Sequence, residues 1–186
     1  MNYWFDMDGV LVKYDRSGYI GEQPMYLRKG VHYFRDLQPD KKAMTVLKAL
    51  SEKSEHKIYI LTTVTNIGAL YKEHVLDKID WLHRHCPFIN TETQFVPAIS
   101  SKRDVIESLR KPNAKMITRD DILIDDFNKN LNEWTIAGGL AVKYLNGLNS
   151  PNKGNPVYTY AGLNLTEDMT ADEIIDVLTM LKQIKI

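Results

Sequence analysis

Short apolar segments alternate with helical segments along most of this chain, and this alternation is the feature that most constrains its fold. The apolar segments have the length of strands, and the residues between them repeat with helical spacing. A strand, a helix and another strand in succession favour a parallel sheet with helices on both faces. We therefore expect an α/β fold, a doubly wound parallel sheet of Rossmann-like type, with strands at 2–6, 57–61, 95–98, 122–124 and 140–144.

Local signals mark helix starts and loops between these strands. Ser101 stands at the cap position of a predicted helix, and Thr170 and Glu173 have the spacing of a capping box. Residues 145–166 are rich in Asn, Gly and Pro, which predicts a loop. The whole chain, 1–186, has the length of one domain with a sizeable core.

The segment 14–38 is irregular and punctuated by glycine and proline, so we expect it to form a small cap inserted into the domain. Its tyrosines include Tyr19, Tyr26 and Tyr33, whose flat faces suit either stacking on a nucleobase or packing within the cap. Arg28 offers a charge contact to a substrate. If these side chains do stack on a base, nucleotides become the favoured substrates.

Two aspartates, Asp6 and Asp8, follow the first predicted strand. Alternate side chains of an extended strand share a face, so both carboxylates should project together. Two like charges at close range require a cation or a shared proton, and a hard cation such as Mg²⁺ prefers oxygen ligands. The pair also suits a division of labour between a nucleophile and an acid/base group. The alternative is an ordinary surface turn, where Asp and Gly are common.

Residues with affinity for phosphate or metal follow the other predicted strands as well. Thr62 offers a hydroxyl group, and Lys102 places a cation at a helix start, where free backbone N–H groups also favour an anion. Asp125 and Asp126 form a second acidic pair. Ligands of doubly wound sheets bind beyond the carboxyl ends of the strands. The pattern therefore predicts a phosphate site with a divalent metal.

Composition narrows the classes of function. Lysine and arginine (24) balance aspartate and glutamate (24), which disfavours binding to polynucleotides or anionic membranes. The single cysteine, Cys86, excludes an internal disulfide and a multi-cysteine zinc site. No apolar run reaches the roughly 18 residues of a membrane span, and strand and site residues begin too early for a cleavable signal. We expect a cytoplasmic protein without a membrane partner.

Four motifs occur in the order found in the haloacid dehalogenase (HAD) superfamily of phosphotransferases, which the chain resembles. They are Phe5-Asp6-Met7-Asp8-Gly9-Val10, Ile60-Leu61-Thr62, Lys102 and Ile124-Asp125-Asp126. Within that superfamily the chain is most similar to the 5′(3′)-deoxyribonucleotidase group. This similarity rests on Leu11 after the first motif, Lys78-x-x-Trp81, Leu123-Ile124-Asp125-Asp126, and Glu133-Trp134 before Ala137-Gly138-Gly139.

The resemblance implies a mechanism and a set of roles. Asp6 attacks phosphorus to form an aspartyl-phosphate, while Asp8 protonates the leaving oxygen and later activates water. Thr62 and Lys102 bind the phosphoryl oxygens, with Thr63 as a helper. The implied enzyme is a HAD-type phosphatase acting on a small phosphorylated substrate, and a nucleoside monophosphate is one candidate.

The resemblance also implies Mg²⁺ as the cofactor. Its ligands would be an oxygen of Asp6, the backbone carbonyl of Asp8 and the side chain of Asp125, with Asp126 in the outer shell. Repulsion from a neighbouring carboxylate favours the protonated form of Asp8 that an acid needs, whereas Mg²⁺ opposes it.

Several alternatives stay open from the sequence alone. A general small-molecule phosphatase, a phosphatase for nucleic-acid ends and a non-catalytic binding protein would share the same fold. The chain has no Gly-x4-Gly-Lys-Ser/Thr loop, so a coupled kinase is not expected. Lys78 either reaches the phosphate or occupies a solvated helix position.

Overall fold

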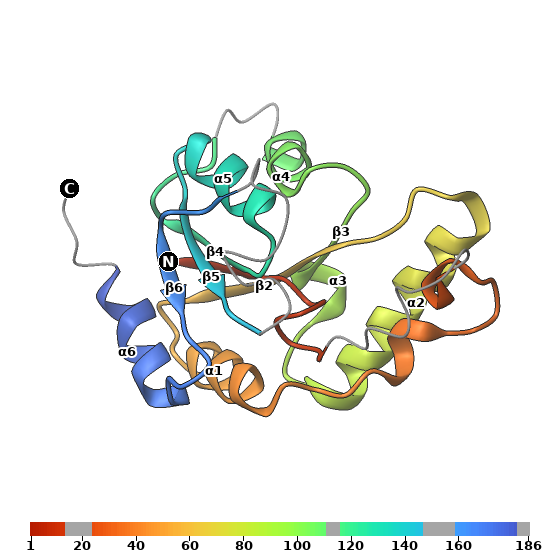
Figure 1. Cartoon of the computed structure of the whole chain (residues 1–186), viewed down its shortest axis with the longest axis horizontal. Helices are drawn as coiled ribbons and strands as arrows, with labels where there is room; N and C mark the ends of the chain where they lie inside the picture. The colour runs from red at the N-terminus through yellow and green to blue at the C-terminus, as the bar shows by residue number, and fades with distance from the viewer. Residues whose placement is uncertain (14–23, 111–115, 147–158, 182–186) are drawn as a thin grey trace.

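The structure is a computed structural model that describes residues 1–13, 24–110, 116–146 and 159–181. Its centre is a six-stranded sheet in the order β3-β2-β1-β4-β5-β6, with every neighbouring pair parallel (Figure 1). The strands are β1 (Asn2–Phe5), β2 (Lys57–Thr63), β3 (Phe95–Ala98), β4 (Asp121–Asp125), β5 (Leu140–Tyr144) and β6 (Leu163–Leu165). The predicted α/β fold with a doubly wound parallel sheet is confirmed.

The first strand lies in the middle of the sheet. Phe5 of β1 is paired in register with Ile60 of β2 on one side and with Ile124 of β4 on the other. The chain builds the sheet outward from β1 in one direction and then returns to build it in the other. This reversal is the switch point at which such sheets bind ligands, and the carboxyl ends of β1, β2 and β4 meet there.

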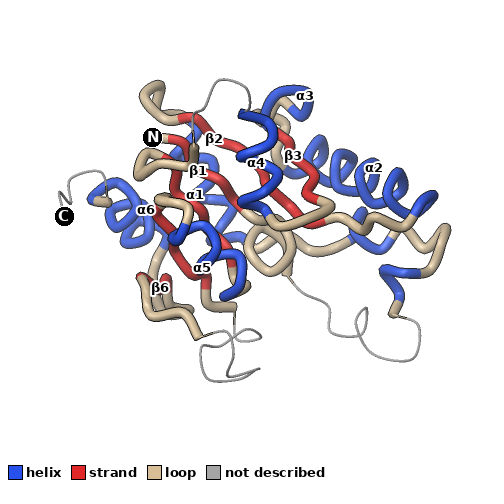
Figure 2. Tube along the Cα trace, turned by 90° about the horizontal axis from the view of Figure 1, so that it is seen from above, coloured by secondary structure: helices blue, strands red, loops and turns tan. Residues whose placement is uncertain are grey.

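Helices cover both faces of the sheet. On one face, α1 (Lys41–Ser51) packs against α6 (Ala171–Met180). On the other, α4 (Lys102–Arg110) packs against α5 (Asn128–Ile136), and Figure 2 looks onto this face. The strand β1 supplies both cores, because Tyr3 and Phe5 join the α1/α6 side while Trp4 joins the α4/α5 side. Burial on both faces explains why the last three residues of β1, Tyr3, Trp4 and Phe5, are all large and aromatic.

The longest helix, α2 (Gly68–His85), extends beyond the sheet (Figure 1). Its last turns enter the α1/α6 core through Trp81, Leu82 and Cys86. Its first turns carry the described part of the predicted cap, which contains two short 3₁₀ helices, η2 (Met25–Leu27) and η3 (Tyr33–Asp36). The remaining helix is the four-residue α3 (Thr91–Gln94). The cap segment is therefore attached to the helix that follows β2.

The predicted strands and helices lie where the sequence placed them. Two features of the structure were not expected, one further strand and the burial of polar side chains on α2. The strand β6 falls inside 145–166, so the prediction of a loop there was wrong in part; a strand of three residues carries no periodic signal. The helix α2 buries three polar residues in its middle turns, His74, Asp77 and Lys78, where an amphipathic pattern predicts apolar ones. None of the helices in the described ranges is long and apolar enough to cross a membrane.

Candidate active site

The predicted site residues converge at the carboxyl ends of β1, β2 and β4. Asp6 follows β1 directly, Thr62 and Thr63 end β2, and Asp125 ends β4. A pocket of about 480 Å³ opens at this edge and is lined by Asp6, Asp8, Thr63, Ser100, Ser101, Asp126, Phe127, Lys129 and Asn130. The sheet thus brings together residues that are far apart in the sequence.

A tight turn places Asp8 beside Asp6. The strand ends at Phe5, and the Met7 carbonyl oxygen accepts hydrogen bonds from the N–H groups of Leu11 and Val12, at 2.9 and 3.0 Å. Gly9 has a φ of +82°, and a Cβ there would lie 2.3 Å from Oδ2 of Asp126. Only glycine satisfies both conditions. The two aspartates are therefore joined by a turn, whereas the expectation that their side chains share a face assumed extended backbone from Asp6 to Asp8.

Lys102 forms ion pairs with both Asp6, after β1, and Asp125, the last residue of β4. Its Nζ lies 2.8 Å from Oδ1 of Asp6 and 2.5 Å from Oδ2 of Asp125, and its side chain is buried. Desolvation on burial lowers the pKa of Lys102, but attraction to Asp125 and Asp6 outweighs it and the pKa is raised. Lys102 therefore stays charged and holds the two carboxylates in place.

Asp125 is fixed further by the start of α5. Its Oδ1 accepts a hydrogen bond from the backbone N–H of Phe127 at 2.8 Å, and its Oδ2 accepts one from Nδ2 of Asn130 at 3.0 Å. Asp126 accepts a hydrogen bond from Nδ2 of Asn146 at 2.8 Å. These contacts fix the orientation of both carboxylates. Asp126 lines the pocket, whereas Asp125 is fully buried and is not one of the lining residues.

Lys78 holds the second aspartate. Its Nζ donates to Oδ2 of Asp8 at 2.5 Å, to Oγ1 of Thr62 at 2.7 Å and to the carbonyl oxygen of Thr63 at 3.0 Å. The same atom lies 4.4 Å from the centre of the Phe34 ring. The side chain is fully buried, so the solvated alternative for Lys78 was wrong. Each of the two aspartates thus has its own buried lysine.

The carboxylates fit a divalent metal. Asp6, Asp125 and Asp126 each offer one oxygen within 4.8 Å of the other two, and all three residues are buried. Burial raises the pKa of Asp6 well above its ordinary value. Attraction to Lys102 lowers this pKa, and repulsion from the other carboxylates of the site raises it further, those of Asp125, Asp8 and Asp126. A cation among these oxygens would relieve that repulsion, and an all-oxygen ligand set suits Mg²⁺. The choice between Asp125 and Asp126 as direct ligands stays a prediction.

Sequence reasoning missed several residues of the pocket. Phe127 exposes 47% of its surface there, and Ser100, Lys129 and Asn130 complete the wall. Phe127 and Asn130 carry no motif of their own; their one signal is their position directly after the acidic pair, at the start of α5.

The described tyrosines of the cap lie elsewhere. Tyr33 and Phe34 are buried, and their rings meet edge to face at 5.1 Å. Tyr26 packs on the same pair, at 6.5 Å from Tyr33 and 6.4 Å from Phe34. Neither tyrosine lines the pocket, so of the two expectations the packing one holds for them. Tyr19 lies outside the described residues.

Comparison with known proteins adds an independent observation. The model of the family described as 5′ nucleotidase, deoxy (pyrimidine), cytosolic type C protein matches residues 24–149, more than half of the chain. The chain belongs to this family of 5′ nucleotidases. The match begins after Asp6 and Asp8 and so does not depend on the opening motif. A comparison with curated proteins returns no match.

Solved structures similar to this nucleotidase have the same fold. A D,D-heptose 1,7-bisphosphate phosphatase from Burkholderia thailandensis is 10% identical, with a TM-score of 0.60, over 96% of this chain and 97% of that one. The corresponding phosphatase from B. bronchiseptica, complexed with magnesium and phosphate, is 11% identical, with a TM-score of 0.64, over 96% and 98%. The predicted resemblance to HAD phosphatases is confirmed, and the nucleotidase is an enzyme of the phosphatase class.

Proposed function

We propose that this nucleotidase is an Mg²⁺-dependent phosphomonoesterase that works through an aspartyl-phosphate on Asp6 and prefers nucleoside monophosphates. The observation that carries the proposal is the pairing of Asp6 with Lys102 and of Asp8 with Lys78 at one pocket. A pure binding site for phosphate would gain nothing from buried carboxylates, which repel the anion.

Asp6 is the nucleophile in this proposal. A carboxylate oxygen of Asp6 attacks phosphorus, a new P–O bond forms, and the ester P–O bond of the substrate breaks. The contact from Lys102 and the hydrogen bond from the backbone N–H of Met7, at 2.7 Å, hold the Asp6 carboxylate in one orientation. This fixed orientation lowers the entropic cost of reaching the attacking geometry.

Asp8 handles the protons. In the first step it donates a proton to the leaving alkoxide, so that the product departs as an alcohol. In the second step it takes a proton from a water molecule whose oxygen attacks the aspartyl-phosphate. The bond between phosphorus and Asp6 then breaks, phosphate leaves and both aspartates return to their initial state.

Thr62, Thr63, Lys78 and Lys102 form the phosphate-binding floor. The hydroxyl oxygen of Thr62 accepts from Lys78, which leaves its own hydrogen for a phosphoryl oxygen. Both lysines are buried, so their charges act at low local dielectric on the negative charge of the phosphoryl group.

Asp6 and Asp125, with the backbone carbonyl of Asp8 and with Asp126 beside them, are the residues that would hold Mg²⁺. When bound, the ion supplies positive charge that offsets both the carboxylates and the phosphoryl oxygens. The B. bronchiseptica phosphatase, which has the same fold, is complexed with magnesium and phosphate, and this supports Mg²⁺ as the ion.

Phe127 supports a nucleotide as the substrate. It lines the pocket next to Asp126 and exposes nearly half of its surface, and an aromatic face of this kind stacks on a nucleobase. Stacking contributes about 1–3 kcal/mol per base. This corresponds to a preference of roughly tenfold or more for a nucleotide over a sugar phosphate of similar size.

Initial rates of phosphate release test this proposal. Deoxyribonucleoside 5′-monophosphates and ribose 5-phosphate should be compared with Mg²⁺ and with a chelator. We expect turnover that requires Mg²⁺ and a kcat/KM at least about tenfold higher for the nucleotides. Phe127→Ala should remove most of this preference by raising KM, whereas Ile136→Ala, an exposed change at the far end of α5, should not.

Two results would contradict the proposal at different levels. Equal efficiency on ribose 5-phosphate and the nucleotides would leave a general small-molecule phosphatase with the same chemistry. Absence of turnover on any phosphomonoester in the presence of Mg²⁺ would overturn the proposed chemistry itself.

A further inference from the structure

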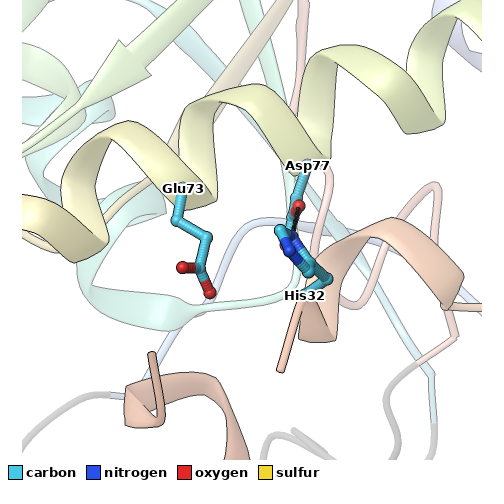
Figure 3. A group of neighbouring side chains, drawn as sticks. All are labelled: His32, Glu73 and Asp77. Atoms are coloured by element: carbon cyan, nitrogen blue, oxygen red, sulfur yellow. Dashed lines mark hydrogen bonds and ion pairs between the residues drawn. The ribbon is translucent and has the colours of Figure 1, made fainter. Parts of the chain in front are cut away.

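A second cluster of metal-ligand types lies outside the catalytic pocket, where the cap segment meets α2. It consists of His32, Glu73 and Asp77, and each offers one potential ligand atom within 4.8 Å of the other two. Glu73 and Asp77 are four residues apart on α2 and so point from the same side of the helix. Figure 3 shows both carboxylates directed from α2 toward the side where His32 lies.

The backbone is arranged to bring His32 to this place. His32 is the residue before η3 and has a φ of +53°, the one non-glycine positive φ in the described part of the chain. A left-handed conformation is unfavourable for a residue with a Cβ and persists where other contacts enforce it. The N–H of the nearby Gly30 donates to both carboxylate oxygens of Glu73, at 2.9 and 3.0 Å.

Asp77 is the residue whose contacts are incomplete. Its side chain is only 4% exposed, and its Oδ1 lies 2.7 Å from Nδ1 of His32. Its Oδ2 is buried and has no hydrogen-bond partner among the residues that the structure describes. A buried carboxylate oxygen without a partner has lost its hydration without compensation, which is costly. A cation bound between Asp77 and its two neighbours would supply the missing contact.

We propose that His32, Glu73 and Asp77 form a second divalent metal site, of the Zn²⁺ class, that fastens the cap segment to α2. The site is separate from the Mg²⁺ site proposed at Asp6 and does not depend on the phosphatase mechanism. It is built from two parts of the chain, since His32 belongs to the cap segment and both carboxylates belong to α2.

The ligand types decide the class of ion. Mg²⁺ prefers oxygen ligands alone, whereas an imidazole nitrogen with carboxylates suits Zn²⁺ and the neighbouring transition metals. The hydrogen shared between His32 and Asp77 would be displaced, because a metal ligand must offer a free lone pair. Water molecules would complete the coordination, since the side chain of His32 is 42% exposed.

Such a site would brace the helix that carries Lys78. Asp77 and Lys78 are adjacent on α2, and Lys78 contacts Asp8 and Thr62. His74 adds a contact of its own one turn earlier, with Nε2 at 2.7 Å from the carbonyl oxygen of Tyr26. Metal binding at His32 would therefore hold the cap segment against the turn of α2 that carries Asp77 and Lys78.

Calorimetric titration with Zn²⁺ in excess Mg²⁺ tests the proposal, because Mg²⁺ then occupies the carboxylate site at Asp6. Wild-type protein should bind one equivalent of Zn²⁺. His32→Ala and Glu73→Gln, both at half-buried positions, should each weaken that binding by at least about tenfold. His83→Ala is the matched control, since His83 is an exposed histidine on α2, the helix that carries Glu73 and Asp77.

The outcomes separate the site from its alternatives. Loss of Zn²⁺ binding in His32→Ala and Glu73→Gln, with retention in His83→Ala, supports it. Equal Zn²⁺ binding by wild type and His32→Ala would overturn it and assign the ion to another place. No Zn²⁺ binding by wild type would also overturn it, and would leave His32 and Asp77 as a hydrogen-bonded contact alone. None of these readouts requires phosphatase activity.

Discussion

Replacing Asp121 by asparagine should remove a specific part of the acid sensitivity of this protein. Asp121 begins β4 and is 1% exposed. Its Oδ1 and Oδ2 accept hydrogen bonds from the Arg110 guanidinium at 2.6 and 2.8 Å. Further hydrogen bonds come from Nδ2 of Asn2, Nε1 of Trp4 and the N–H of Thr118, at 2.9, 3.2 and 3.0 Å.

These contacts fix the sign and the size of the effect. Burial raises the pKa of Asp121, but the hydrogen bonds, led by those from Arg110, outweigh it and lower the pKa from 3.8 to about 2. Each pKa unit corresponds to about 1.4 kcal/mol, so the ionised carboxylate contributes about 2 kcal/mol to the free energy of unfolding. Because the folded pKa is the lower one, the contribution is complete above pH 4 and is lost as the pH falls toward 2. About 1 kcal/mol of it should be gone at pH 3.

Urea unfolding followed by tryptophan fluorescence measures this contribution between pH 7 and pH 3. The difference in unfolding free energy between wild type and Asp121→Asn should be largest at neutral pH and shrink by about 1 kcal/mol at pH 3. Asp120→Asn, at the exposed neighbouring position, should follow the wild type at each pH. A difference between wild type and Asp121→Asn that does not change with pH would show that the ionised Asp121 carboxylate does not stabilise the fold.

Three further predictions concern the catalytic site and the core. Lys78→Met should lower kcat by about 100-fold or more without unfolding the protein, whereas Lys72→Met, at an exposed position of the same helix, should leave kcat unchanged. An unchanged kcat in Lys78→Met would exclude Lys78 from binding the phosphoryl group. Asp125→Ala should weaken Mg²⁺ binding in calorimetry more than Asp126→Ala, and the opposite order would reverse the ligand assignment. Gly139→Ala should lower the free energy of unfolding in urea by about 1–3 kcal/mol, because its Cβ would lie 2.4 Å from Nε1 of Trp134; an unchanged midpoint would contradict this.

The fold could be predicted because its central strands are buried on both faces. β4 is buried at every position and β1 at three of its four, so the sequence shows a short apolar run in each, Tyr3 to Phe5 in β1 and Ile122 to Ile124 in β4. The strand β6 escaped prediction because it has three residues and lies at the edge of the sheet, where only one neighbouring strand constrains it. Its first residue is exposed, so no alternation develops.

Part of the candidate site could be predicted for the same reason. Asp6 and Asp125 directly follow or end buried strands, and parallel strands bring their carboxyl ends together. The burial of Lys78 could not be predicted, because its partner Asp8 lies 70 residues earlier in the chain and the contact exists only after folding. Phe127 had no signal either, since an exposed aromatic residue after a strand is common and becomes informative only beside a pocket.

If the phosphoryl group passes through Asp6, the covalent intermediate on Asp6 can be trapped. A reaction with deoxyribonucleoside monophosphate and Mg²⁺ should be quenched rapidly, treated with borohydride and digested for mass spectrometry. Borohydride reduces an aspartyl-phosphate to homoserine, so we expect homoserine at position 6 in wild type and at no position in the inactive Asp6→Asn variant. Turnover by Asp6→Asn, or reduction at another aspartate, would exclude Asp6 as the nucleophile.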